Sequence, residues 1–157
     1  MRTSVDVHNF LVERDVPHEV FPVRGRLRSA ERLAALLELP PEEVGKVIVF
    51  EGSEGAVAAA VPAGRSPDTG RVRKAADRPD LEPAADDRAA AITEYLPESL
   101  PPVGLPDGVQ LILDRSLARD AVLYFAGGEA HAVLKIRGKD LVRAAGAKVA
   151  RIATSEE

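Results

Sequence analysis

Residues 47–61 read VIVFEGSEGAVAAAV, and this stretch decides the fold. The run 47–50 is β-branched and aromatic without a polar interruption, which is typical of a buried strand. Residues 51–55 have the glycine-bearing composition of a turn, and 57–61 form a second apolar run. Two such runs joined by a short turn predict a buried β-hairpin.

Outward from this hairpin, helical and strand patterns alternate irregularly. Apolar spacing and capping residues predict helices at about 3–14, 29–37, 68–76, 86–95 and 140–145, with Asp86 as the cap of the fourth. Further strands are predicted at 18–23, where Pro22 favours a sheet edge, and at 109–113, 122–125, 132–136 and 149–152. Strict βαβ repetition is missing. We therefore expect an α+β fold with one mixed, mostly antiparallel sheet or partial barrel of about six to seven strands, surrounded by helices.

Composition restricts the class of protein. The chain has 157 residues, 45% of them hydrophobic, and a formal net charge of −4. This length predicts one domain, residues 1–157, with a core at about 5–152. The absence of cysteine excludes disulfides, thiolate metal sites and a cysteine nucleophile. Without a signal peptide or a membrane span in the sequence, we expect a soluble, cytoplasmic protein.

Common catalytic motifs do not account for a function. Gly45-Lys46 resembles the end of a phosphate-binding loop, but the earlier glycine and the following Ser or Thr are missing. The three histidines are scattered without metal-ligand spacing, so we expect surface or satisfied core histidines and no metal site. Two arginine clusters, at 24–32 and 71–78, fit solvated faces better than a nucleic-acid site. On these signals alone the chain is a mixed α/β domain.

One ordered set of segments is more informative than any single motif. It begins with a helix containing Ser29 and Ala34, and continues with LPPEEVGKVIVF at 39–50, VPAG at 61–64, TEY at 93–95, PPVG at 101–104, LILDRSL at 111–117, VLYFAGG at 122–128 and KDL at 139–141. In this order and spacing the chain, from about residue 5 to residue 152, resembles the YbaK/EbsC family. Members of that family are relatives of the editing domain inserted in bacterial prolyl-tRNA synthetases.

The resemblance implies an aminoacyl-tRNA deacylase that acts in trans. Such a protein hydrolyses the ester between a wrong amino acid, such as alanine or cysteine on the proline tRNA or a related pair, and the terminal adenosine. It implies no metal, no cofactor and no covalent protein nucleophile. The expected partners are the tRNA acceptor end and an aminoacyl-tRNA synthetase, with no membrane or DNA contact.

The resemblance assigns the catalytic role to Lys46. A cation at the start of a buried strand can reach phosphate or ester oxygens while its stem packs on apolar walls, and the alternative is an ordinary surface lysine. The implied substrate-binding residues are Tyr95, Glu98, Ser99, Pro102, Gly104, Asp114, Gly127 and Gly128. Structural roles are the alternatives here: rigid packing for the proline, capping of the 115–116 turn for the aspartate, and a tight hairpin turn for the two adjacent glycines.

The chain departs from the family pattern at the site itself. Glu98 and Ser99 occupy the positions of the loop's usual paired glycines, whose backbone amides orient the carbonyl and the water in the family. Phe125 stands where a serine is usual, and Ala132 where a pocket-facing aspartate is usual, which predicts a more apolar pocket. We hypothesise that Glu98 supplies a carboxylate that positions water or the substrate's α-amino group.

Two functions therefore stay open on the sequence. The first is hydrolysis of a mischarged aminoacyl-tRNA, which retention of Lys46 and Pro102 favours. The second is a non-catalytic binding module that kept the fold and binds a nucleotide, an aminoacyl derivative or a protein partner in the same cleft, which the altered loop glycines favour.

Overall fold

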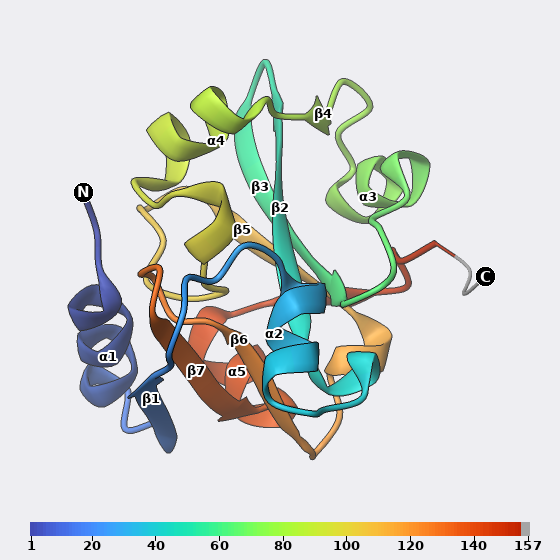
Figure 1. Ribbon diagram of the computed structural model, residues 1–157. Coiled ribbons are helices and arrows are strands. Elements are labelled where there is room, and N and C mark those ends of the chain that lie inside the picture. The colour runs from blue at the N-terminus through green and yellow to red at the C-terminus, as the bar shows by residue number, and fades with distance from the viewer. Residues whose placement is uncertain (155–157) are drawn as a thin grey trace.

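The computed structural model describes residues 1–154, and in this part of the chain eight strands form two sheets (Figure 1). The five-stranded sheet has the order β4-β2-β3-β5-β8, and the three-stranded sheet has the order β1-β7-β6. The strands are β1 (His18–Pro22), β2 (Gly45–Gly52), β3 (Gly55–Pro62), β4 (Glu82–Pro83), β5 (Gln110–Asp114), β6 (Val122–Ala126), β7 (Ala132–Arg137) and β8 (Lys148–Ala150).

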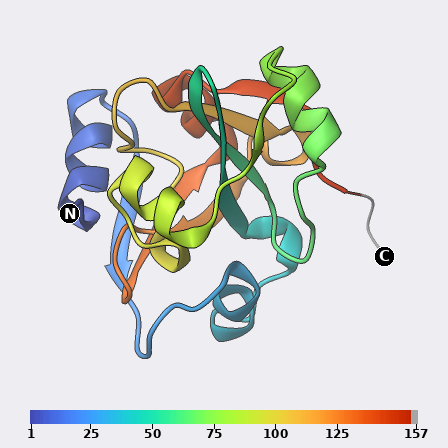
Figure 2. The ribbon, with the colours of Figure 1, turned by 90° about the horizontal axis from the view of Figure 1, so that it is seen from above.

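Five α-helices and three short 3₁₀ turns of the described chain surround the sheets. They are α1 (Ser4–Glu13), α2 (Ala30–Leu36), η1 (Pro41–Glu43), α3 (Thr69–Ala76), α4 (Asp86–Thr93), η2 (Pro97–Ser99), η3 (Arg115–Leu117) and α5 (Gly138–Ala145). Figure 2 shows α1 and α3 on opposite sides of the sheets. Within residues 1–154, no helix combines the length and the apolar character needed to cross a bilayer.

The predicted hairpin is confirmed and forms the centre of the larger sheet. β2 and β3 pair antiparallel from Gly45–Pro62 to Gly52–Gly55. β5 and β8 then add parallel to β3, which makes the sheet mixed. From Ala56 onward every residue of β3 is buried, because helices and loops cover both of its faces.

The side chains of β2 alternate between two cores, as a pleated strand requires. Val47 and Val49 pack in a large core that also contains Tyr95 of the loop after α4. Phe50 packs on the other face in a second core with Val72 of α3. Lys46 lies at the start of the strand, at the edge of these two cores, and its side chain is partly exposed.

The α+β fold class is confirmed, but the single sheet is not. The two sheets are joined by one isolated bridge, between Val44 and Tyr124, so that strands β2 and β6 meet at a point without closing a barrel.

The short strand β4 was not predicted, because its two residues carry no strand pattern. The prediction that Asp86 caps the fourth helix is wrong as well. The N-cap is Ala85, and Asp86 is the first residue inside α4, one position too late for a side-chain cap.

Candidate functional site

Lys46 stands at an open edge of the five-stranded sheet. On one side it pairs with Val61 of β3. On the other side β4 pairs only with Phe50 and Glu51, so residues 46–48 have no strand neighbour there within the described chain. Lys46 keeps 23% of its side chain exposed. Its stem is therefore packed, and its ammonium group reaches the surface.

A hollow of about 350 Å³ lies against this edge of β2. Its walls come from β2, from the start of α2, from the start of α4 and from the η2 turn. The lining residues are Arg28, Ser29, Ala30, Glu31, Lys46, Val47, Ile48, Asp86, Pro97, Glu98 and Leu100. The fold thus places Lys46 and Glu98, which are distant in the sequence, in one hollow.

Glu31 holds the ammonium group of Lys46. The Lys46 Nζ donates to Glu31 Oε2 at 2.8 Å, and the backbone N–H of Gly64 donates to the same oxygen at 2.8 Å. Partial burial raises the pKa of Glu31, but these two hydrogen bonds outweigh burial and leave the pKa below its ordinary value. Glu31 lies in the first turn of α2, whose start is fixed by Ser29 accepting from the Arg32 N–H at 3.1 Å. The helix start therefore orients the lysine.

Glu98 forms the second ion pair of the hollow. Arg26 donates from Nη2 to Glu98 Oε1 at 2.8 Å, and this hydrogen bond is the main reason why the pKa of Glu98 lies below its ordinary value. The Glu98 side chain is 30% exposed. An ionised carboxylate in this position can accept a hydrogen bond from an ammonium group or from water. The hollow thus places the Lys46 ammonium group and the Glu98 carboxylate, each with a charged neighbour, beside three further charged lining residues, Arg28, Glu31 and Asp86.

The backbone amides next to Glu98 are already used inside the η2 turn. The N–H of Ser99 donates to the Leu96 carbonyl at 3.0 Å, and the N–H of Leu100 donates to the Pro97 carbonyl at 3.5 Å. The family resemblance implies that loop amides orient the substrate. Of the site residues that the resemblance implies, Lys46 and Glu98 are the two that line the hollow, and both carry a charge and are partly exposed.

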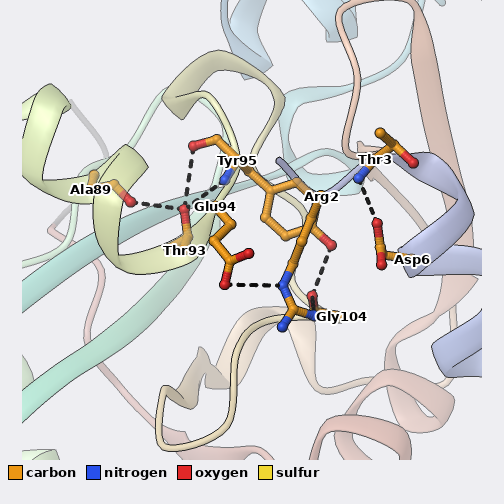
Figure 3. Close-up of polar contacts among 8 residues, drawn as sticks. All are labelled: Arg2, Thr3, Asp6, Ala89, Thr93, Glu94, Tyr95 and Gly104. Carbon is orange, nitrogen blue, oxygen red and sulfur yellow. Dashed lines mark hydrogen bonds and ion pairs between the residues drawn. The ribbon is translucent and has the colours of Figure 1, made fainter.

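Tyr95 and Gly104 close the base of the loop, as Figure 3 shows. Neither residue lines the Lys46 hollow. The buried Tyr95 hydroxyl donates to the Gly104 carbonyl at 2.8 Å, and Arg2 Nη1 donates to the same carbonyl at 3.2 Å. Burial raises the pKa of Tyr95 far above its ordinary value. Gly104 has φ +71°, and a Cβ there would lie 2.9 Å from the Tyr95 hydroxyl. Pro102 and Gly104 border a separate hollow of about 410 Å³.

Gly127 and Gly128 connect the loop to the β6–β7 hairpin. The N–H of Gly128 donates to the carbonyl of Ser99 at 3.0 Å, and the N–H of Gly127 donates to the carbonyl of Ala132 at 2.9 Å. Gly128 has φ +96°, and a Cβ there would lie 3.1 Å from the backbone of Thr3. Both glycines and the buried Ser99 lie outside the lining of the Lys46 hollow, in positions that support the loop.

Asp114 lies at the end of β5, also away from Lys46. Its Oδ1 accepts from the N–H groups of Ile152 and Ala153, both at 2.9 Å, and its Oδ2 accepts from the Ser116 N–H at 3.2 Å and from the Ser116 hydroxyl at 2.5 Å. Burial raises the pKa of Asp114, but these hydrogen bonds outweigh it and hold the pKa below its ordinary value. The predicted cap of the 115–116 turn is confirmed, and the same carboxylate also anchors the C-terminal segment.

Comparison with known proteins agrees with this architecture. Residues 25–144 match the model of the aminoacyl-tRNA editing domain. The chain belongs to the aminoacyl-tRNA editing domain family. Membership confirms the predicted activity class, an aminoacyl-tRNA deacylase, and makes tRNA the substrate of the domain. A comparison with curated proteins gave no match.

Solved structures share the whole fold of this editing domain. The crystal structure of hypothetical protein APE2540 has a TM-score of 0.88 at 25% identity, over 95% of this chain and 99% of its own. A candidate trans-editing enzyme for prolyl-tRNA synthetase has a TM-score of 0.84 at 23% identity, over 99% of both chains. A candidate signal transduction protein from Marinobacter aquaeolei VT8 has a TM-score of 0.67 at 16% identity, and this chain covers 31% of it.

Two expectations about the pocket of the editing domain are wrong. Phe125 does not line the Lys46 hollow but is fully buried, with its ring against the backbone of Gly45. Ala132 borders a different hollow, next to Phe21 and Glu129. The two residues therefore do not make this hollow more apolar. Phe125 instead supports the start of β2, directly before Lys46.

Sequence reasoning missed the partners of the charged groups. Glu31 and Arg26 are charged residues in a helix start and in a basic cluster, and no spacing rule connects them to Lys46 or Glu98. It also missed a contact between His8 and His18, in which His8 Nδ1 lies 2.9 Å from His18 Nε2. Within residues 1–154, no three His, Asp or Glu side chains are grouped as metal ligands.

Proposed function

We propose that the Lys46 hollow binds the aminoacylated 3′ end of a mischarged tRNA and hydrolyses the ester that joins the amino acid to the terminal ribose. The observation that carries the proposal is the shared hollow of Lys46 and Glu98, an ammonium group and a carboxylate on facing segments of one family fold. The open edge of β2 supplies the space for the substrate.

In the proposed reaction, water attacks the ester carbonyl carbon and a tetrahedral oxyanion forms. The Lys46 ammonium stabilises this negative charge, as a fixed cation does best in a partly water-excluded site. Glu98 accepts a hydrogen bond from the substrate's α-ammonium group or from the attacking water. As the intermediate collapses, the bond to the ribose oxygen breaks and that oxygen takes up the proton that the attacking water has lost, which leaves a free amino acid and a tRNA with a free terminal hydroxyl group.

The surroundings of the ammonium group suit this task. Glu31 and the Gly64 amide hold one position for Lys46, and a preorganised charge need not rearrange during the reaction. Ala30, Val47, Ile48 and Leu100 give the hollow apolar walls. We therefore propose a small, uncharged amino acid as the group removed, such as alanine or cysteine on the proline tRNA or a related pair, with an aminoacyl-tRNA synthetase as the source of the mischarged tRNA. The proposal places this reaction in the cytoplasm and needs neither a membrane nor DNA.

The non-catalytic binding module is the second candidate, and one observation favours it. The two charged groups to which the reaction is assigned are already paired, Lys46 with Glu31 and Glu98 with Arg26. A site built only to bind could keep these pairs intact, whereas catalysis requires the substrate to share or displace them.

A deacylation panel separates the two candidates. Wild type, Lys46→Ala and the exposed control Lys74→Ala are incubated with tRNAs carrying alanine, cysteine, serine or the correct amino acid. We expect hydrolysis of at least one small mischarged amino acid and a loss of about 10²–10³-fold in Lys46→Ala only, the scale of removing one oxyanion-stabilising group. An absence of turnover on every pair would overturn the assignment of ester cleavage to the Lys46 hollow in favour of the binding module.

A further inference from the structure

A second hollow lies beside the Lys46 hollow and has a different chemistry. Its volume is about 520 Å³. It is lined by the end of β3 and the turn after it, by η1 and by the η3 region, together with Thr154. Two arginines, Arg65 and Arg119, and three hydroxyl side chains, those of Ser66, Ser116 and Thr154, are among the lining residues.

The two arginines keep their charge available to a ligand. Arg65 Nε donates to the carbonyl of Thr154 at 2.7 Å, and Arg119 Nη2 donates to the carbonyl of Glu42 at 3.2 Å. Both acceptors are neutral, and neither arginine forms an ion pair with another residue of the described part of the chain. The Glu42 carboxylate is the one acidic side chain that lines the hollow. The Ser116 hydroxyl already donates to Asp114. Guanidinium groups and hydroxyls such as those of Ser66 and Thr154 are the groups that contact phosphate oxygens in nucleic-acid complexes.

The two hollows meet at Glu31 and Gly64. Gly64 lines the second hollow, Glu31 lines the first, and the Gly64 N–H donates to the oxygen of Glu31 that also binds Lys46. A strand that ends at Lys46 and continues past Gly64 therefore reaches Arg65 next. The acceptor end of a tRNA is single-stranded, so its backbone can follow such a path.

We propose that the second hollow binds a backbone phosphate of the tRNA acceptor strand, on the 5′ side of the aminoacylated nucleotide, through Arg65 and Arg119. This inference rests on the proposed function for the identity of the ligand. Arg65 and Arg119 bind the strand and set the direction in which the 3′ end enters, while the ester itself lies at Lys46.

Binding is tested with a fluorescent RNA hairpin that carries a single-stranded 3′ end, titrated at several salt concentrations. The variant is Arg65→Gln/Arg119→Gln. The charge-matched control is Arg137→Gln/Arg143→Gln, which removes two exposed arginines that are paired with aspartates. We expect the variant to bind about tenfold more weakly, with the salt slope reduced by about 1 for each arginine, and the control to bind like wild type. The variant Arg65→Lys/Arg119→Lys should keep most of the salt dependence of binding. This result would show that the loss in the glutamine variant is due to charge and not to misfolding.

Hydrolysis of two substrates separates this inference from the proposed function. The ester of 3′-aminoacyl-adenosine has no internucleotide phosphate, so the glutamine variant should hydrolyse it like wild type but lose about tenfold in kcat/KM on aminoacyl-tRNA. Equal losses on both substrates, or on neither, would overturn the phosphate site. RNA binding that depends on these arginines without turnover of either substrate would instead overturn the proposed function and keep the phosphate site.

Competition with inorganic phosphate distinguishes a strand phosphate from a free one. At constant ionic strength, millimolar phosphate should leave the hairpin bound, because the strand is also held at the Lys46 hollow. Displacement of the hairpin by phosphate alone would show a small-anion site and overturn the assignment to the acceptor strand.

Discussion

Lys46 and Tyr95 both lie in segments through which the chain resembles its family, but their surroundings differ in every respect that matters for chemistry. Lys46 has a partly exposed side chain, a charged partner and a hollow beside it. Tyr95 is 1% exposed and donates its hydroxyl to the Gly104 carbonyl across the base of the loop. Residues of one family pattern therefore divide into those that face a substrate and those that hold the loop in place.

Among the residues that hold the structure in place, substitution of Asp114 should cause the largest loss of stability. Asp114→Asn replaces an acceptor of four hydrogen bonds by an amide whose NH₂ group opposes the donors of Ser116. We expect the free energy of unfolding to fall by about 2–3 kcal/mol, measured by urea denaturation. The rate of deacylation by folded protein should not change, and Asp107→Asn, at an exposed position, should leave stability unchanged.

The pH dependence of stability checks the same carboxylate. The pKa of Asp114 is lowered in the folded protein, so its contribution to stability is complete above the ordinary pKa of an aspartate and is lost as the pH falls through the lower folded value. Wild type should therefore lose its advantage over Asp114→Asn in acid. A constant difference between the two proteins down to about pH 2 would contradict this assignment.

The Glu31→Gln variant tests whether the orientation of Lys46 matters for hydrolysis. Glu31→Gln keeps an acceptor for the Gly64 amide but removes the charge that holds the ammonium group. We expect kcat/KM to fall by about tenfold with a change in stability below about 1 kcal/mol, because exposed ion pairs contribute little to folding. Glu38→Gln, just after the same helix, is the matched control. Unchanged kcat/KM in Glu31→Gln would mean that Lys46 acts without this partner.

Tyr95 gives the smallest expected effect. Tyr95→Phe removes one buried donor while Arg2 still donates to the Gly104 carbonyl. We expect a loss of about 1 kcal/mol in the free energy of unfolding and unchanged kcat/KM. Tyr124→Phe removes the other tyrosine hydroxyl of the chain and serves as the control. A large loss of kcat/KM in Tyr95→Phe at unchanged stability would move Tyr95 to the substrate side of the comparison.

The parts of the fold that depend on local pattern were predictable. The apolar runs at 47–50 and 57–61 gave the central hairpin, and Ser29 was the expected cap of α2. Division into two sheets was not predictable, because it depends on long-range pairing of β1 with β7, which no local pattern encodes. The domain limits of 1–157 remain a prediction, and residues 155–157 lie outside the described chain.

The site was predictable only in part, for a similar reason. The resemblance singled out Lys46 and Glu98, which share a hollow, together with seven other residues that lie outside it. The partners Glu31 and Arg26 are brought to these groups by folding alone. No property of a glutamate at a helix start distinguishes one that holds a lysine from one that only complements the helix dipole.

The single-turnover rate of deacylation at saturating enzyme tests the central claim most directly, because neither substrate affinity nor product release then affects it. For Lys46→Ala we predict a rate lower by at least about 10²-fold, with a melting temperature like that of wild type. An unchanged single-turnover rate in the folded variant would contradict the assignment of ester cleavage to Lys46.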